Sequence, residues 1–169
     1  MANKKHYIIT AVTLGIIAAS SGALIGLTNL ITHDRIDYNK KQKIKTCLVK
    51  IFGDDAVSLK DEDYKLGYVT HYYDLGDGKY AFQTTGSNTY GKLELLIGVQ
   101  ANEFVRLYSL NNEQTYASTL EENYITLINR EKNKRDYTDV SCGATYGASL
   151  ARDMVEDAIK ASIELSKKE

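Results

Sequence analysis

The sequence predicts an α+β protein in which one N-terminal transmembrane helix precedes a small domain of mixed sheet and helices. Three observations support this: a long uncharged apolar run near the N-terminus, a tyrosine-rich middle region interrupted by glycines, and helical spacing of apolar residues near the C-terminus. The chain has 169 residues, of which 43% are hydrophobic and 25% charged. We expect an anchor over residues 1–34 and one domain over residues 35–169, because roughly 130 residues can close a single hydrophobic core.

The predicted anchor is the uncharged run Tyr7–Ile31. It is long enough to span a membrane, because a helix needs about 20 residues to cross the hydrocarbon core. The alternative is a cleaved signal peptide, with Lys4 and Lys5 as its charged start and a cleavage site near Ser21 or Ala23. The apolar run continues well past such a site, which favours a spanning helix.

Small residues recur every four positions along the anchor and predict a face that another helix can approach closely. They are Ala18, Gly22 and Gly26. The orientation of the anchor stays open. Lys4 and Lys5 favour a cytoplasmic N-terminus, yet five basic residues beginning at Arg35 follow the run, and larger domains can be exported despite flanking charge.

Residues 35–53 are expected to leave the membrane as a helix. Apolar residues fall at helical spacing from Asp37 to Phe52, with lysines between them, and Gly53 supplies a stop. Cys47 lies on the apolar face, which favours a small core residue over a reactive thiol.

Glycine-rich turns and short polar turns then separate four expected strands. The strands cover residues 66–74, 79–84, 92–99 and 103–110. The first two are joined by Gly76-Asp77-Gly78, and the last two by residues 100–102. Tyrosines in the first pair suit a half-buried sheet surface.

Two helices and a charged linker complete the expected domain. Ser118 and Thr119, each followed three residues later by a glutamate, form overlapping capping boxes that open a helix. Its expected apolar face holds Tyr124, Leu127 and Ile128. Residues 131–136 are an expected solvated linker. The final helix is expected to bury one stripe, formed by Leu150, Met154, Ala158, Ile159 and Ile163.

Charge and motif content exclude several functional classes. Behind the anchor the chain carries 19 basic and 22 acidic residues, so it has no basic excess for binding nucleic acid. Cys47 and Cys142 are too far apart to indicate a disulfide framework, and the three histidines do not cluster with cysteines or carboxylates at metal spacing. A nucleophile elbow, a Walker loop and a dinucleotide-binding turn are all absent from the sequence.

One segment, Asp139–Tyr146, leads directly into the last helix and has the composition of a ligand site. Gly143 and Ala144 let a ligand approach the backbone, and the N–H groups at a helix start favour an anion. Thr145 adds a hydroxyl where a phosphate would lie. The alternative is an ordinary helix start capped by Thr145 or Ser149.

The pattern Asp139-x-x-x-Gly143-Ala144-Thr145 resembles the flavinylation motif of the FMN-binding domain family, usually Asp-x-x-Ser/Thr-Gly-Ala-Thr. Members include the G subunit of the Rnf electron-transport complex and the C subunit of the sodium-translocating NADH:quinone reductase. The resemblance implies that Thr145 carries FMN through a phosphoester bond installed by a flavin transferase that uses FAD. It extends weakly to the anchor, at Gly26, Leu27, Asn29 and Thr32, and to Ile97-Gly98-Val99.

The sequence departs from the family pattern at two places. Cys142 stands where the family has Ser or Thr, and of the family's Glu-Thr-Pro-Gly turn only Glu113 carries over. The resemblance implies that Asp139 and Ser141 are recognition or orienting residues in the FMN-binding site. Together with these, the implied site includes Glu113, Cys142, Gly143, Ala144 and Thr145.

The resemblance implies an electron-transfer subunit that relays electrons within an Rnf-type ion-translocating ferredoxin:NAD oxidoreductase, with little turnover alone. Its partners would be other membrane subunits and the flavin transferase. The chain would be single-pass in the cytoplasmic membrane, with its domain on the extracytoplasmic side. Two alternatives stay open: a stand-alone extracytoplasmic flavoprotein, and a cofactor-free scaffold with a degenerate motif.

Overall fold

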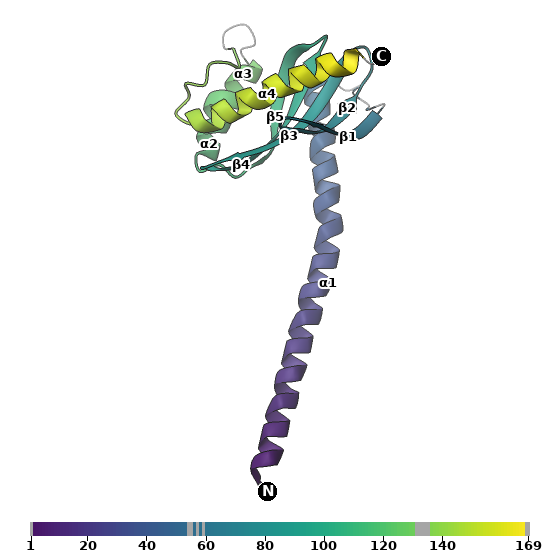
Figure 1. Ribbon diagram of the computed structural model, residues 1–169, viewed down its shortest axis with the longest axis vertical. Coiled ribbons are helices and arrows are strands. Elements are labelled where there is room, and N and C mark those ends of the chain that lie inside the picture. The colour runs from purple at the N-terminus through teal and green to yellow at the C-terminus, as the bar shows by residue number, and fades with distance from the viewer. Residues whose placement is uncertain (1, 54–55, 57, 59, 131–135, 168–169) are drawn as a thin grey trace. The chain divides into compact units, whose positions relative to one another are not determined.

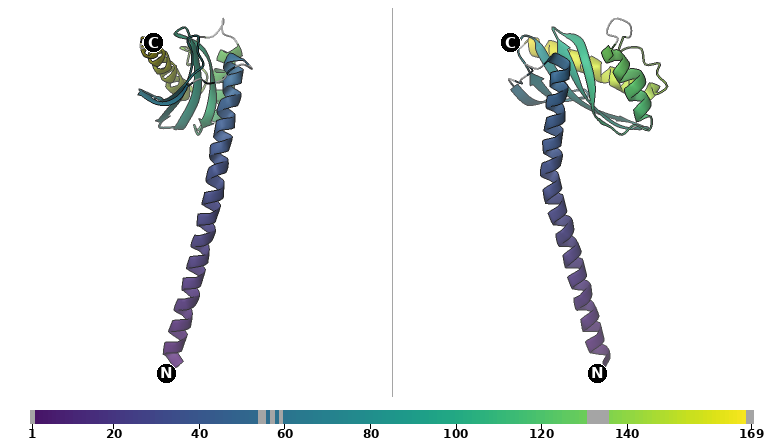
Figure 2. Two further views of the ribbon diagram at one scale, coloured as in Figure 1. Left: turned by 90° about the vertical axis from the view of Figure 1, so that its right-hand side faces the viewer. Right: turned by 180° about the vertical axis from the view of Figure 1, so that it is seen from behind.

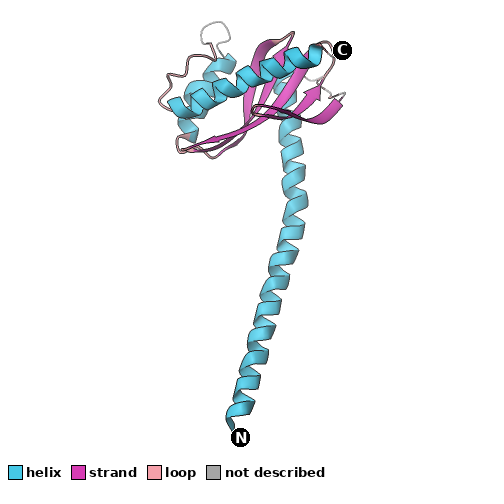
Figure 3. Cartoon of the chain, viewed as in Figure 1, coloured by secondary structure: helices cyan, strands magenta, loops and turns pink. Residues whose placement is uncertain are grey.

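The computed structural model describes residues 2–53, 56, 58, 60–130 and 136–167, without the side chains of residues 2–5, 29–31, 33 and 34. The chain divides into two compact units, Met1–Gln42 and Lys43–Glu169. The first unit is helical, and the second combines a sheet with helices (Figures 1 and 3). The predicted α+β class is therefore confirmed. The expected linker at residues 131–136 falls almost wholly outside the described residues.

The first unit belongs to helix α1 (Ala2–Phe52). Within the described part of the chain, one segment, His6–Thr28, is long and apolar enough to cross a membrane by length and composition. Its 23 residues lie inside the predicted anchor apart from His6, and none of its side chains is buried.

The hydroxyl groups of this helix bond to its own backbone. Six side chains each donate to the carbonyl oxygen four residues earlier, at 2.7–2.9 Å. They are Thr10, Thr13, Ser20, Ser21, Thr28 and Thr32. Because unsatisfied polar groups are costly in hydrocarbon, these internal bonds make the segment compatible with a bilayer.

The second unit is built on a five-stranded sheet in which every neighbouring pair is antiparallel and the strands follow chain order. The strands are β1 (Lys60–Leu66), β2 (Val69–Asp74), β3 (Lys79–Asn88), β4 (Gly91–Gln100) and β5 (Glu103–Asn112). Short turns join all of them, so the sheet is a simple meander. The four expected strands are confirmed, with shifted boundaries.

Strand β1 was not predicted. Its sequence KDEDYKL is mostly charged, and only Tyr64 and Leu66 are half-buried. The expected strand at 66–74 in fact contains a turn, because Gly67 has φ of +55° and the chain reverses before Val69. A charged edge strand carries little of the apolar alternation on which sequence prediction depends.

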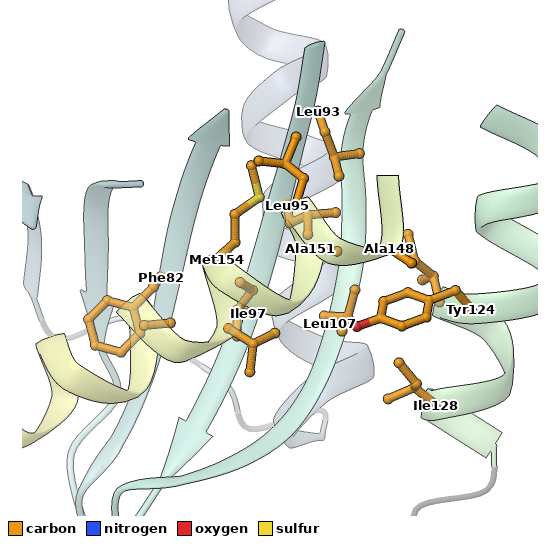
Figure 4. Close-up of a cluster of buried hydrophobic side chains, with 14 of the residues drawn as sticks. Phe82, Leu93, Leu95, Ile97, Leu107, Tyr124, Ile128, Ala148, Ala151 and Met154 are labelled. Atoms are coloured by element: carbon orange, nitrogen blue, oxygen red, sulfur yellow. The ribbon is translucent and has the colours of Figure 1, made fainter. Parts of the chain in front are cut away.

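The larger core lies between the sheet and helix α4 (Thr145–Ser166), which crosses one face (Figure 2). Figure 4 shows Ala148, Ala151 and Met154 of α4 facing residues of β3 and β4. Alternate residues of β4 supply this face, namely Leu93, Leu95, Ile97 and Val99, all fully buried. Burying each such side chain stabilises the fold by about 1.5–3 kcal/mol.

The opposite face of the sheet is covered by the last turns of α1, which belong to the second unit. Ile44, Cys47, Leu48 and Ile51 are buried there against Leu96 and its neighbours, so the predicted core position of Cys47 is confirmed. Burial raises the pKa of the Cys47 thiol, although nearby lysines oppose this shift. The approach of helix and sheet is close, because a Cβ atom on Gly98 would lie 2.2 Å from Cγ2 of Ile51.

A short helical segment packs beside β5. It comprises α2 (Ala117–Leu120), a π-helical turn η1 (Glu121–Ile125) and α3 (Thr126–Arg130). The predicted capping boxes are wrong: the helix begins at Ala117 after Tyr116, so Ser118 and Thr119 already lie within it, and no side chain caps it. Tyr124 and Ile128 are buried as predicted, Leu127 is half-buried, and the wider π turn also buries Ile125.

Asn129 of α3 closes part of the β5 edge. Its Nδ2 donates to the Leu107 carbonyl at 2.7 Å, and its Oδ1 accepts from the Leu107 N–H at 3.1 Å. The side-chain amide therefore takes the place of a neighbouring strand's peptide group.

Helix α4 follows its predicted stripe except at the end. Leu150, Met154 and Ala158 are buried and Ile159 is half-buried, whereas Ile163 is 38% exposed. The prediction for Ile163 was wrong because Ala161 and Ser162 occupy the buried face of the last turns.

Candidate functional site

A pocket of about 240 Å³ lies at the start of α4. Three segments line it. The β3–β4 turn supplies Tyr90, and the region after β5 supplies Gln114, Tyr116 and Leu120. The third segment is the two residues before α4 and the first three residues of the helix, Gly143 to Gly147. Three of the predicted site residues, Gly143, Ala144 and Thr145, therefore border one pocket.

The start of α4 has no side-chain cap. Ala144 is the N-cap residue, Thr145 is the first helical residue, and no side chain bonds to the cap. The alternative in which Thr145 or Ser149 caps the helix is therefore wrong. The first turn of the helix closes with the Ala148 N–H bonded to the Ala144 carbonyl at 3.0 Å. The N–H groups that precede Ala148 in the helix need other acceptors, and an anion is a suitable one.

The loop before α4 is shaped by Asp139 and Gly143. The Oδ1 atom of Asp139 accepts a hydrogen bond from the Ser141 N–H at 3.1 Å, and this bond closes a turn within the loop. Gly143 has φ of +81°, a conformation that L side chains rarely adopt, so the family's glycine is required here by the backbone. Asp139 and Ser141 are exposed and lie outside the pocket lining.

Cys142 points into the core. Its side chain is 8% exposed and belongs to the cluster between α4 and the sheet, and it does not line the pocket. Its backbone carbonyl accepts a hydrogen bond from Nδ2 of Asn123 at 3.3 Å, which joins the loop to the π turn.

Glu113 also lies outside the pocket lining. Its carboxylate accepts a hydrogen bond from Nδ2 of Asn111 at 2.9 Å, and the side chain is exposed. Its backbone is closely packed, because a Cβ atom on Gly91 would lie 2.1 Å from the Glu113 carbonyl oxygen. The β3–β4 turn thus rests on the backbone beside Gln114.

Gln114 is a site residue that the sequence did not predict. It is only 6% exposed, although it lines the pocket. Its Nε2 donates to the Gly91 carbonyl at 2.5 Å, while among the described residues nothing donates to its Oε1. That oxygen lies 3.4 Å from the position of a Cβ atom on Gly147, on the pocket wall beside the first turn of α4.

Three tyrosines form the outer wall, and we call Tyr90, Tyr116 and Tyr146 the tyrosine rim. The rings of Tyr90 and Tyr146 are stacked, with centroids 5.1 Å apart and planes at 29°. Tyr116 lies against Tyr90 with centroids 6.4 Å apart. As whole residues, Tyr90, Tyr116 and Tyr146 are 37%, 55% and 67% exposed. Exposure of three large aromatic rings around one pocket is typical of a ligand site.

Hydrogen bonds to the backbone of Tyr90 and Tyr146 hold the rim together. The Asn88 Oδ1 accepts from the Tyr90 N–H at 2.8 Å, and its Nδ2 donates to the Tyr146 carbonyl at 3.1 Å. The Thr115 N–H donates to the Tyr90 carbonyl at 2.8 Å. These bonds link the three segments that line the pocket. A sequence signal existed for Tyr146, which follows the motif directly, but none distinguished Tyr90 from the other tyrosines.

The arrangement combines four chemical features. An exposed threonine hydroxyl and an uncapped helix start suit a phosphate, while an aromatic wall and a buried amide oxygen suit a flat heterocycle with a donor edge. Among the described residues no cluster of three or more His, Cys, Asp and Glu could hold a metal ion.

Comparison with known proteins supports the N-terminal part of the resemblance. Residues 1–51 match a family model described as the RnfG N-terminal region. The match covers the anchor and the helix that packs on the sheet, so the predicted resemblance to the G subunit of the Rnf complex is confirmed over these residues. No curated protein and no solved structure matches the chain.

Proposed function

We propose that this protein is the G-type, membrane-anchored subunit of an Rnf-type ion-translocating ferredoxin:NAD oxidoreductase and carries FMN covalently on Thr145. One observation carries the proposal: the exposed Thr145 is the first residue of an uncapped helix and borders a pocket with aromatic walls. The match of residues 1–51 to the RnfG N-terminal region suggests the Rnf-type subunit independently of that pocket.

The residues present fit a covalently held FMN. The flavin phosphate would lie at the start of α4, where its charge interacts favourably with the N–H groups and the helix dipole. No described residue hydrogen-bonds to the Thr145 hydroxyl, so the hydroxyl is available for attachment. The buried Oε1 of Gln114 is a polar atom that a ligand in the pocket could satisfy.

Attachment would proceed by phosphoryl transfer on the transferase. Thr145 would supply the hydroxyl oxygen that bonds to the FMN-side phosphorus of FAD and would lose its proton, and AMP would leave as the bond from this phosphorus to the bridging oxygen breaks. Asp139 and Ser141 are exposed on the loop before the helix, where a transferase could recognise them. Because Cys142 is buried, its thiol replaces the family's hydroxyl without entering the pocket.

The bound FMN supplies reversible electron transfer, and the protein sets its position. Tethering replaces diffusion with a high effective concentration near the redox partners. In this proposal residues 1–34 anchor the chain in the cytoplasmic membrane beside partner subunits, and residues 35–169 form the FMN-binding domain on the extracytoplasmic side.

The test is flavin fluorescence of the denatured band on a gel, after co-expression with a flavin transferase. We expect a fluorescent wild-type band and a dark Thr145→Val band. Thr138→Val is the matched control, because Thr138 is exposed on the same loop outside the pocket lining, and it should stay fluorescent. A dark wild-type band beside a fluorescent relative would instead support the cofactor-free scaffold. A fluorescent protein that purifies without other redox subunits would support the stand-alone carrier.

A further inference from the structure

We propose that Gln114 reads the imide edge of the flavin ring and that the tyrosine rim stacks on the ring, so that the pocket recognises isoalloxazine even without the covalent bond. The proposal rests on the proposed function for the identity of the ligand. It adds a ring-binding subsite whose residues lie outside the Asp139–Thr145 motif.

The first step concerns the position of Gln114. A side chain with an exposed fraction of 6% has lost nearly all of its contact with water. Its amide nitrogen is used internally, by the Gly91 carbonyl, and this bond fixes which end of the amide faces the pocket. The Oε1 atom of Gln114 therefore has a fixed orientation, and no described residue donates a hydrogen bond to it. A buried acceptor left in this state costs free energy, which a donor on the ligand would recover.

The second step concerns the chemistry of the ligand. The pyrimidine end of isoalloxazine has one imide N–H between two carbonyl groups, and this N–H is a hydrogen-bond donor at the ring edge. An amide oxygen is the matching acceptor. Purely apolar rings have no such donor, so Gln114 would give selectivity as well as affinity. A site built to hydrogen-bond a ligand group rejects analogues that lack it.

The third step concerns the tyrosine rim. The stacked rings of Tyr90 and Tyr146 present an aromatic face, and the ring of Tyr116 lies against Tyr90 and enlarges it. Asn88 and Thr115 hold the backbone of this wall in place before any ligand arrives. Preorganised aromatic surfaces bind flat rings with little loss of side-chain freedom. Stacking on tyrosine would also quench flavin fluorescence.

The test uses lumiflavin, which has the ring but neither ribityl chain nor phosphate, and its N3-methyl derivative, which lacks the imide N–H. Both are titrated into the full chain in detergent, made without transferase, and binding is followed by quenching of flavin fluorescence. We expect wild type to favour lumiflavin over the N3-methyl derivative by roughly tenfold. Gln114→Met should remove this preference. Tyr146→Leu should lower the affinity for both ligands by a similar factor, so that the preference for lumiflavin remains.

The controls separate binding from folding and from attachment. Thermal unfolding of each variant shows whether it is folded, and the wild-type comparison of the two ligands needs no mutation. Equal affinity of wild type for both ligands, or no binding of either, would overturn the proposal. Thr138→Val, which lies outside the pocket lining, should bind lumiflavin like wild type. A dark wild-type band on the gel, combined with intact selectivity for lumiflavin, would refute the covalent attachment but not the ring-binding subsite. A fluorescent wild-type band without this selectivity would refute only the ring-binding subsite.

Discussion

The side-chain amide of Asn88 joins the β3–β4 turn to the first turn of α4 through its hydrogen bond to the Tyr146 carbonyl at 3.1 Å. The same side chain accepts the Tyr90 N–H, so one residue positions both stacked tyrosines. The geometry of the rim therefore depends on a residue that is itself part of neither the pocket lining nor the motif.

Replacing Asn88 by Ala should loosen the rim. Loss of two hydrogen bonds should lower the free energy of unfolding by about 1–2 kcal/mol, because a typical bond contributes roughly 1 kcal/mol. Urea unfolding of the full chain in detergent measures this value. Asn111→Ala removes a single exposed bond to Glu113 and should cost less than about 0.5 kcal/mol. Equal effects of the two variants would contradict the role of Asn88.

Gly98→Ala should push the last turns of α1 away from the sheet. The added Cβ would lie 2.2 Å from Ile51 Cγ2, and overpacking of this kind costs about 1–3 kcal/mol. The double variant with Ile51→Ala should recover part of that loss, because the shorter side chain leaves room. A double-mutant cycle on unfolding free energies gives the coupling. Strictly additive effects would show that the two sites do not press on each other.

Stability should fall at alkaline pH because of Tyr73. Burial, with a smaller contribution from the Asp61 carboxylate, raises the pKa of Tyr73 to about 12 from an ordinary value of 10.0. The folded state thus favours the protonated phenol, and its stabilising contribution is complete below pH 10 and is lost as the pH rises toward 12. Tyr73→Phe should show a shallower decline in unfolding free energy over this interval. An unchanged slope in Tyr73→Phe would assign the decline to other groups.

Cys142→Ser restores the family motif, yet it should leave flavinylation nearly unchanged. The Cys142 side chain packs in the core and does not line the Thr145 pocket. Burying a hydroxyl in place of a thiol should instead lower the unfolding free energy, by about 1–3 kcal/mol if the hydroxyl finds no partner. A time course of gel fluorescence per unit protein gives the attachment rate. A severalfold faster rate in the serine variant would mean that the transferase reads this side chain directly.

Leucines at Gly22 and Gly26 should weaken co-purification with partner subunits. A Cβ at either position meets no atom of this chain within 4 Å, so the protein itself tolerates the change. Ser20→Leu is the matched control, because at about 100° per residue Ser20 projects from the far side of the helix. Unchanged assembly of the double leucine variant would remove this face as a contact.

Sequence patterns predicted the helices and strands in which apolar residues are regularly spaced. They missed a charged edge strand and the residue at which a short helix begins. The apolar N-terminal helix, the packed end of α1 and strands β2–β5 all show apolar runs or regular spacing, and the structure has them. Strand β1 is held by pairing with β2 rather than by apolar content, so its charged sequence gave no strand signal. The capping boxes failed because serine and threonine are only candidates for caps, and here the N-cap is Tyr116, two residues before Ser118.

The candidate site divides in the same way. Gly143, Ala144 and Thr145 are contiguous, so a motif could identify them, and the structure gathers them at one pocket. Gln114, Tyr90 and Tyr116 come from other segments, and only the pairing of β3 with β4 and of β4 with β5 brings those segments to α4. A contact made through sheet register leaves no trace in local spacing.

The amide of Asn129 has a consequence for a protein confined to a surface. Tethering concentrates copies in two dimensions, where exposed strand edges could join one sheet to the next. At β5 the Leu107 peptide is already bonded by Asn129, and at the other end β1 presents lysine, aspartate and glutamate along its exposed length. The two borders of the sheet are thus poor templates for added strands, which would let the protein crowd in a membrane without polymerising through its sheet.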